Sequence, residues 1–514
     1  MRRRCQRDIQ LAAFEQTERD FLRRYPDYAG TSAIDELRAV DYSRLDRLGH
    51  VYLDYTGGGQ FGESQLRRHH DLLCGTVLGN PHSHNPTSLA ATQLVQEARD
   101  AVLAFFNADE EEYEVVFTAN ASGALKLVGE AYPFRPGSVY LLSYDNHNSV
   151  NGIRVYARSR GAAVTYVPVR KKDLRLDEEQ LQLALRGIVS RGCRVASRSA
   201  ADAGDGRCRV TDDRDAPSAD SCRDHLFAYP AQSNFSGVQH PLEWIAQAQD
   251  LGWDVLLDCA AFAPTNPLDL SAIHPDFVPV SFYKLFGYPT GVGALIARRE
   301  KLAKLRRPWF AGGTITLASV QEEGWYQLAP GAQGFEDGTL DYLGLPAVTI
   351  GLERLIAVGM ATVHTRVCCL AGWLLEELGA LRHSNGAPLV SILGPADVER
   401  RGATVALLLL DPGGRPYDVY DVETAAGERL ISIRTGCFCN PGDGEVAHDL
   451  GHADMERCFR DRRAVISLLQ CQQVIEDATG KLPNTIRVSL GLVSDFSDVY
   501  RFLELAAGYR DRVS

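Results

Sequence analysis

Residues 281–293 read Ser-Phe-Tyr-Lys-Leu-Phe-Gly-Tyr-Pro-Thr-Gly-Val-Gly. One lysine, Lys284, stands here among aromatic and small residues, directly before a turn rich in glycine and proline. The apolar run at residues 292–297 that follows predicts a buried strand. A partly desolvated lysine loses its proton more readily and becomes a nucleophile able to form a Schiff base. Taken alone, Lys284 would more often be a surface lysine at a strand end.

Asp258 gives Lys284 a chemical partner. It ends the apolar run at residues 253–258, and an acid at the carboxyl end of a parallel strand faces the crevice where α/β proteins bind ligands. Such a carboxylate can keep a pyridinium nitrogen protonated, which makes the ring of pyridoxal phosphate an electron sink. The alternative for Asp258 alone is a helix N-cap.

The wording SFYKLFGYPTGVGALIAR (residues 281–298), after a strand that ends in aspartate, resembles the class V aminotransferase superfamily of pyridoxal phosphate enzymes. Within it, the wording resembles the N-terminal, cysteine desulfurase-like domain of molybdenum cofactor sulfurases. YLDYTGGGQ (residues 52–60) and GNPHSHN (residues 79–85) resemble the opening motifs of that family. The resemblance implies the α/β architecture called fold type I of these enzymes, with a mostly parallel, doubly wound sheet and a smaller C-terminal α+β domain.

The order of strands and helices along the chain independently favours a doubly wound sheet. We expect a helical N-terminal segment (residues 1–48), a large domain that binds pyridoxal phosphate (residues 49–345) and a small C-terminal domain (residues 346–514). Residues 188–225 lose all periodicity and are dominated by Arg, Ser, Asp, Ala and Gly, which predicts a linker-like or disordered insertion. The thiols inside it, Cys193, Cys208 and Cys222, are expected at the surface.

Composition excludes several classes of function. The net charge of −12 argues against a nucleic-acid-binding surface, and no apolar run approaches the length needed to span a membrane. The basic start lacks the apolar segment of a signal peptide, which favours a cytoplasmic location. Twelve cysteines in so long a chain predict no disulfide framework and a reducing compartment. His82 and His84 lack a third ligand nearby, so we expect loop and pocket-wall roles and no metal site.

A phosphate-binding turn is predicted where the strand at residues 114–118 is followed by small residues and a helix. This arrangement aims backbone N–H groups and a helix N-terminus at a phosphate, which makes Asn120, Ala121 and Ser122 the candidates. The alternative is an ordinary N-cap by Ser122. The resemblance adds Ser281 to the phosphate contacts. It also implies that Thr314, in the glycine-rich segment at residues 309–316, reaches the phosphate of a partner subunit.

Two more residues are expected at the cofactor ring. His147 follows the strand at residues 138–142 and matches the position where the family stacks an imidazole or aromatic ring on the cofactor; it could also carry protons. A satisfied loop histidine is the alternative. Asn234 lies before a glycine turn and matches the position of an amide donor to the phenolic oxygen of the cofactor. Gln232 could do similar work.

A second chemical centre is predicted at RTGCFCNPG, residues 434–442. The planar fork of Arg434 suits bidentate capture of an amino-acid carboxylate. Cys439 lies in a loop bounded by glycine and proline, where a mobile thiolate could take sulfur from a bound cysteine. The alternative is that Cys437 and Cys439 pack as small hydrophobic residues. The segment resembles the sulfurase motif, with Cys439 at the position of the persulfide cysteine, although that motif usually continues NPGAC and this chain has Asp443 and Gly444 instead.

Together these features predict a cysteine desulfurase or sulfurtransferase dependent on pyridoxal phosphate, which forms a persulfide on Cys439 from L-cysteine and releases alanine. A homodimer is expected. Full-length sulfurases carry a further C-terminal domain that binds the molybdenum cofactor, and this chain ends at Ser514, so we expect a sulfur acceptor in trans, such as a molybdenum-cofactor protein. One alternative is a different lyase or transferase of specialised metabolism on the same scaffold. Another is a non-catalytic scaffold dimer.

Overall fold

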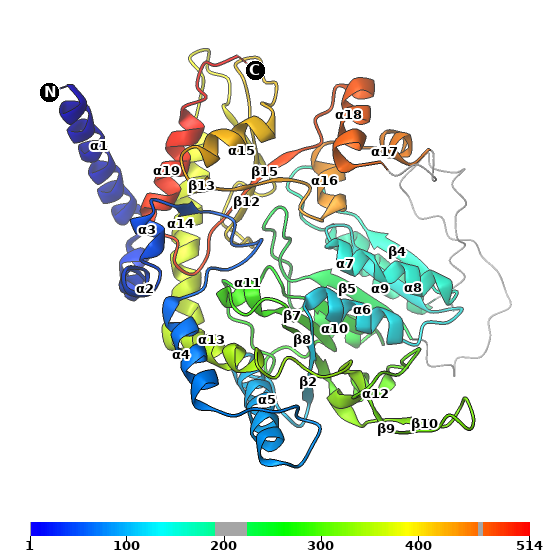
Figure 1. The fold of residues 1–514 in the computed structure, drawn as a ribbon. Helices are drawn as coiled ribbons and strands as arrows, with labels where there is room; N and C mark the ends of the chain where they lie inside the picture. The colour runs from blue at the N-terminus through cyan, green and yellow to red at the C-terminus, as the bar shows by residue number, and fades with distance from the viewer. Residues whose placement is uncertain (1, 191–223, 461–465, 514) are drawn as a thin grey trace.

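The fold is seen in a computed structural model that describes residues 2–190, 224–460 and 466–513 (Figure 1). Its centre is a seven-stranded sheet in the order β2-β8-β7-β6-β5-β3-β4. The strands are β2 (Tyr113–Thr118), β3 (Val139–Ser143), β4 (Ala163–Val167), β5 (Leu226–Pro230), β6 (Asp254–Asp258), β7 (Phe277–Ser281) and β8 (Gly293–Arg298). β8 runs antiparallel to both its neighbours and the other pairs are parallel, which confirms the mostly parallel sheet.

Helices cover both faces of this sheet, as expected because the inner strands β3, β5, β6 and β7 are buried at every position. Along β3, Val139 and Leu141 pack into one core and Tyr140 and Leu142 into the other, because successive side chains point to opposite faces. Helices α5 (Pro86–Phe105), α9 (Glu178–Ser190), α10 (Trp244–Gln249) and α13 (Leu345–Val358) contribute to the first core. Helices α6 (Ala121–Ala131), α8 (Ile153–Ser159) and α12 (Arg299–Lys304) contribute to the second. The result is a doubly wound α/β domain.

A second sheet, antiparallel throughout, has the order β11-β12-β15-β14. It comprises β11 (Val390–Leu393), β12 (Thr404–Leu409), β14 (Arg434–Gly436) and β15 (Thr485–Ser489), and it packs with α14 (Met360–Ala380), α15 (Val419–Gly427) and α19 (Phe496–Ala507) around a separate core. This α+β unit agrees with the predicted smaller C-terminal domain.

The N-terminal segment joins this second unit. It forms α1 (Arg2–Arg24), a 3-10 helix (Pro26–Thr31), α2 (Ala33–Asp41) and α3 (Arg44–Arg47), and Phe21 and Tyr28 pack into the C-terminal core. β1 (Val51–Tyr52) pairs in parallel with β13 (Ile431–Ser432). The predicted boundary at residues 345 and 346 falls at the start of α13, which packs against α5 and against α4 (Glu63–Gly75). The domain limits therefore stay a prediction.

The predicted insertion lies almost wholly outside the described residues. Residues 188–190 still belong to α9, and His225 leads into β5 with its Nδ1 accepting from the backbone N of Val139 at 3.0 Å. Residues 191–223, with their three cysteines, are not among those that the structure describes.

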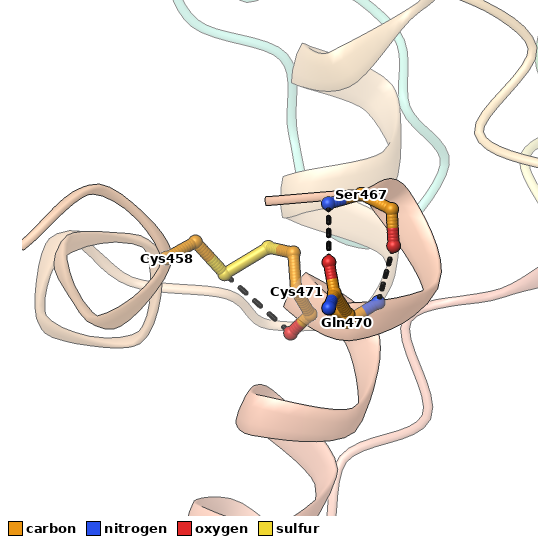
Figure 2. The surroundings of a disulfide bond; sticks show 4 residues. All are labelled: Cys458, Ser467, Gln470 and Cys471. Atoms are coloured by element: carbon orange, nitrogen blue, oxygen red, sulfur yellow. Dashed lines mark hydrogen bonds between the residues drawn. A yellow bond between two sulfur atoms is a disulfide. The ribbon is translucent and has the colours of Figure 1, made fainter. Parts of the chain in front are cut away.

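The prediction about disulfides needs one correction, because Cys458 and Cys471 are bonded to each other. Their Cα atoms lie 5.2 Å apart, within the range that the bond requires. The bond joins α17 (His452–Phe459) to α18 (Leu468–Thr479), whose first turn is held by reciprocal hydrogen bonds between Ser467 and Gln470 (Figure 2). The two cysteines are 13 residues apart on separate helices, so their spacing alone carried no signal.

A hairpin of β9 (Ile315–Ala318) and β10 (Tyr326–Leu328) projects from the edge of the large domain (Figure 1). Within the described ranges, no single helix has the length and apolar character to cross a membrane; α13 and α14 meet that test only as a pair, bent by 69°.

Candidate active site

A cavity opens at the carboxyl ends of β5, β6 and β7, where α/β proteins bind ligands. It encloses about 750 Å³, counted with its opening to solvent. The structure brings eight of the predicted site residues together around it: Asn120, Ala121, Ser122, His147, Asn234, Asp258, Ser281 and Lys284. Gln232, Ser149 and Tyr283 also line it.

Lys284 lies on α11 (Phe282–Phe286), a single helical turn that begins directly after β7 and ends at Gly287 with φ of 81°. The part of its side chain that is not covered by protein faces the cavity, and its Nζ has no hydrogen-bond partner among the described residues. Burial lowers the pKa of this amine, while the charge of Asp258 partly offsets the effect. An unpaired amine with a lowered pKa is the nucleophile that Schiff-base chemistry needs.

Asp258 is the last residue of β6 and is buried, with Oδ1 accepting from the backbone N of Ala260 at 3.0 Å. The chain continues in turns rather than in a helix, so the N-cap alternative does not apply. Its charge raises the pKa values of both Lys284 and His147 against the lowering by burial. Asp258 therefore lines the cavity close enough to both groups to change their pKa values.

His147 caps the short helix α7 (Asn148–Asn151), because its Nδ1 accepts from the backbone N of Ser149 at 3.1 Å. His147 lines the cavity, and its Nε2 has no hydrogen-bond partner among the described residues. Burial lowers the pKa of the imidazole, so the neutral form dominates at neutral pH.

The phosphate-binding turn is held on two sides. Asn120, not Ser122, is the N-cap of α6, and its side chain accepts from the backbone N of Gly123 at 2.9 Å. The backbone N of Ala121 donates to Oγ of Ser281 at 3.3 Å, and Oγ of Ser122 lies 2.7 Å from Oγ of Ser149. At Gly293 a Cβ would lie 2.6 Å from Cα of Asn120, so only glycine lets β8 approach this turn.

Both predicted amide donors lie at the cavity, but some of their hydrogen-bonding groups already have partners in the protein. Nδ2 of Asn234 donates to the carbonyl of Phe438 at 2.7 Å, which leaves one N–H free. Nε2 of Gln232 donates to the carbonyl of Ala261 at 3.0 Å, and its Oε1 accepts from Gln239.

Arg434 does not face an open site, because its fork is occupied. Nε and Nη2 of Arg434 bind the carboxylate of Asp54 at 2.6–3.0 Å, and its side chain is half exposed. Asp54 comes from the loop that follows β1. Arg434 is therefore a clamp between the N-terminal loop and β14, and any capture of a substrate carboxylate requires Asp54 to be displaced or shared.

Sequence reasoning missed a second arginine, Arg487. It lies opposite Arg434 on the neighbouring strand β15 and is 2% exposed. Its Nη2 donates to Oδ1 of Asp54 at 2.9 Å and its Nη1 to the carbonyl of Asn234 at 2.9 Å. Its charge lowers the pKa values of Lys284 and His147, so it lies near both. The signal was a lone arginine inside the apolar strand TIRVS, since arginine is almost never buried without a role.

Cys439 is exposed in a short loop between β14 and α16 (Pro441–Ala447), which speaks against packing as a hydrophobic residue. The residues on both sides of Cys439 are packed against the rest of the site, and the mobility of the loop stays a prediction. Phe438 is buried against Phe235 and under the guanidinium of Arg487, and Asn440 is fully buried. The carbonyl of Cys439 accepts from the backbone N of Asn148 at 2.7 Å. Its charge raises the pKa of Lys284, so the thiol lies near the lysine.

The remaining predicted residues lie elsewhere. Thr314 is buried at the root of the β9–β10 hairpin, and its hydroxyl donates to the carbonyl of Ala311 at 2.8 Å. His82 and His84 are exposed loop residues, and among the residues that the structure describes no group of three His, Cys, Asp or Glu could hold a metal ion.

Comparison with known proteins agrees with this geometry. The aminotransferase class-V family matches residues 51–190 and 216–502. The chain is 33% identical to molybdenum cofactor sulfurase of Solanum lycopersicum over 95% of its length and 35% identical to that of Homo sapiens over 92%. It spans only 59% and 51% of those relatives. The apo structure of a cysteine desulfurase from Thermococcus onnurineus NA1 has a TM-score of 0.71 at 20% identity, over 92% of this chain and 97% of that one.

The predicted resemblance, the fold type and the pyridoxal phosphate-dependent enzyme class are confirmed by these matches. The matched residues include both the strand that delivers Lys284 and the loop that carries Cys439. The chain belongs to the aminotransferase class-V family.

Proposed function

We propose that this chain is a cysteine desulfurase dependent on pyridoxal phosphate, which moves sulfur from L-cysteine to Cys439. The observation that carries the proposal is the arrangement around Lys284. Its unpaired amine and the carboxyl group of Asp258 line one cavity. The charge of an exposed thiol, Cys439, raises the pKa of that amine. A desulfurase needs an amine, an acid and a nucleophilic sulfur at one site.

The residues present fit pyridoxal phosphate. The N-terminus of α6 with the hydroxyls of Ser122, Ser149 and Ser281 would hold the phosphate. Asp258 would face the ring nitrogen, His147 the ring, and the free N–H of Asn234 the ring oxygen. When bound through Lys284, the cofactor supplies an electron sink for the carbon that bears the amino group. The protein supplies position and charge.

Arg487 is our candidate for the substrate carboxylate, together with Arg434. Arg487 is buried beside Asn234, while Arg434 is farther toward solvent. The charges of both arginines lower the pKa of Lys284, so both lie near it. Asp54 holds both guanidinium groups, so their forks are oriented before substrate arrives. A second carboxylate would share this pair of positive charges with Asp54.

The transfer of sulfur from L-cysteine to Cys439 needs no further reactant. The thiolate of Cys439 forms an S–S bond with the substrate sulfur, the C–S bond of the substrate breaks, and the carbon takes up a proton. Lys284, whose amine is free to take and give protons, is placed to deliver that proton. The products are alanine and a persulfide on Cys439.

The test is the variant Cys439→Ser with Cys437→Ser as matched control in the same loop. Cys439→Ser should bind cofactor and cysteine as the wild type does but form almost no alanine, because no thiolate receives the sulfur. Cys437→Ser should keep alanine formation. Wild-type protein incubated with cysteine should carry one extra sulfur on the peptide containing Cys439, removable by reductant. Undiminished alanine formation by Cys439→Ser would refute the proposal.

One observation favours a second candidate, another lyase or transferase reaction on the same scaffold. Phe438 and Asn440 hold the Cys439 loop in place, whereas a thiol that carries sulfur to a distant acceptor needs freedom. In such an enzyme Cys439 would be a bystander, and the Cys439→Ser variant would retain its reaction with cysteine. The same experiment therefore separates the two candidates.

A homodimer and an acceptor in trans belong to the proposal. The β9–β10 hairpin exposes large apolar side chains, which a partner subunit would cover. They are Leu317, Val320, Trp325 and Tyr326. A contact of Thr314 with the partner's phosphate would require its bond to Ala311 to open. Light scattering should give twice the chain mass, and a monomer with full cofactor occupancy would exclude a shared site. The cytoplasmic location stays a prediction.

A further inference from the structure

Two fully buried carboxyl groups lie beneath the Cys439 loop and take no part in the mechanism above. They are Asp443, in the first turn of α16, and Asp145, in the loop that follows β3. Both have zero exposure, and one oxygen of each, Oδ1, has no hydrogen-bond partner. Burying two neighbouring carboxylates that each have an oxygen without a partner is costly, which favours a proton on one of them.

The contacts of Asp443 indicate where a proton can reside. Oδ2 accepts from Oγ of Ser233 at 2.6 Å. Oγ of Ser233 already accepts from the backbone N atoms of Phe235 and Ser236, so its own proton goes to Asp443. The unpartnered Oδ1 is the remaining place for a proton on this carboxyl.

The contacts of Asp145 favour its ionised form. Its Oδ2 lies 2.7 Å from Nε2 of His240, a buried imidazole stacked on Trp244. A ring N–H that faces a carboxylate donates to it. The groups that face Asp443 are thus Ser233 and Ser236 from the large domain and Asp145, with His240 behind Asp145.

The pair also forms a joint between the two halves of the site. Nδ2 of Asn440, next to Cys439, donates to the carbonyl of Asp145 at 2.8 Å, and its Oδ1 accepts from the backbone N of Asp443 at 3.1 Å. At Gly442 a Cβ would collide with the carbonyl of Tyr144, so α16 is pressed against the segment that leads to His147. Moving α16 therefore moves Cys439.

We propose that Asp443 is a positioning residue that carries a proton on Oδ1 beside ionised Asp145, and that this proton keeps α16 and the Cys439 loop seated on the large domain. Loss of the proton places two negative charges side by side in the interior. The carboxylates then need water, and α16 must lift to admit it. The sequence segment NPGDG places this acid where the related motif has alanine, so the device is a feature of this chain.

The direction of the effect follows from linkage. Burial and the charge of Asp145 raise the pKa of Asp443 well above 3.8. The folded state therefore keeps a proton that the unfolded state loses, and this carboxyl lowers stability progressively as pH rises from 3.8 toward its folded pKa. A neutral side chain at position 443 should remove that loss.

The experiment measures access to Cys439 without turnover. Holoenzyme is treated with iodoacetamide across a pH series, and alkylation of the Cys439 peptide is quantified by mass spectrometry relative to the exposed Cys74 in the same sample. The variants are Asp443→Asn and Asp443→Ala. Glu445→Gln is the matched control, since Glu445 is another carboxyl with a raised pKa on α16, but it faces Tyr144.

In the wild type and in Glu445→Gln, relative alkylation of Cys439 should rise at least about fivefold in one step as rising pH removes the proton of Asp443, because the loop opens. In either neutral variant of Asp443 the step should be absent, and the thermal midpoint should fall less with rising pH. Should Asp443→Asn fail to fold, Asp443→Ala makes the same test. Coincident profiles for the wild type and the neutral variants would overturn the proposal.

This inference rests on the proposed role of Cys439, but the two fail separately. Alkylation reports the position of the loop and needs no desulfuration. If Cys439→Ser still forms alanine while the alkaline step is present, the proposed function fails and the positioning role of Asp443 stands.

Discussion

The site has two walls, of which only the first lines the cavity, and they are built in opposite ways. On the wall formed by β6, β7 and α6, Lys284 has no hydrogen-bond partner among the described residues, and the residues around it come from turns directly after strands. On the wall formed by β14, β15 and α16, Arg487, Arg434 and Asn440 are each bound to groups from the other half of the molecule. The first wall supplies reactivity and the second supplies position.

The largest effect should come from removing the unpaired amine. Lys284→Ala should lower activity at least ~10³-fold, because it removes both the covalent anchor and the proton carrier. The variant should also lose the visible absorption of the bound cofactor and its fixation by borohydride. Lys126→Ala, an exposed lysine on α6, is the control and should change neither. Borohydride fixation that persists in Lys284→Ala would place the anchor on another lysine.

Substitutions of the two arginines on the second wall should differ in their effect on KM. Arg487→Ala should raise KM for cysteine roughly 30- to 700-fold, because removing a buried charge with partners costs about 2–4 kcal/mol. Arg434→Ala should raise KM no more than about fivefold, as expected for an ion pair that is half exposed. Steady-state kinetics separates them, with circular dichroism as the check on folding. Equal effects would show that both guanidinium groups bind the substrate.

Replacing His147, on the first wall, should have a smaller effect on activity. His147→Asn keeps an acceptor for the backbone N of Ser149 and should lower kcat by roughly 10- to 100-fold if the imidazole moves protons. Because burial lowers the pKa of His147, the wild type should keep its neutral ring, and its activity, to a pH below 6.5. As pH falls through 6.5, the unfolded chain gains a proton that the folded one resists, so His147 also lowers stability on the acid side.

The pH dependence of kcat measures the role of His147. The acid limb should be absent in His147→Asn. An unchanged limb would assign the ionisation to another group.

The smallest effect on activity should come from the disulfide, which lies outside both walls. Cys458→Ser should leave kcat and KM unchanged and lower stability by about 2–3 kcal/mol, the range for closing a short loop. Thermal unfolding with and without reductant measures this, with Cys74→Ser as control. A peptide map under non-reducing conditions should link Cys458 to Cys471; free thiols at both positions would contradict the bond.

The same contrast explains what could be predicted from the sequence. Lys284, Asp258 and the turn at Asn120 each follow an apolar strand, and the carboxyl ends of parallel strands meet at one edge, so local pattern was enough. Arg434 and Arg487 face each other across two antiparallel strands, and only the strand order makes β14 the exposed edge and β15 an inner strand. Motif resemblance favoured Arg434, and the contacts of Arg487 are what add it to our proposal.

Long-range packing accounts for the remaining differences. The packing of Phe438 beside Cys439 was not predicted, because its partners Phe235 and Arg487 are distant in the sequence. Asp54 gave no signal because its partners come from the other end of the chain. Asp443 was visible only as a departure from a motif, and its burial against Ser233 gives that departure a physical meaning.

The pairing of the N-terminal segment with the C-terminal unit has a consequence for synthesis. Arg38 binds Asp498, 460 residues later, and β1 finds its only strand partner among the described residues in β13. At ribosomal rates of about 5–20 residues per second, Arg38 must wait roughly 20–90 s for Asp498 to be made. During that time the apolar faces of Phe21 and Tyr28 have no core to join. The N-terminal segment is therefore made first, but its packing is completed only after the C-terminal unit has been made.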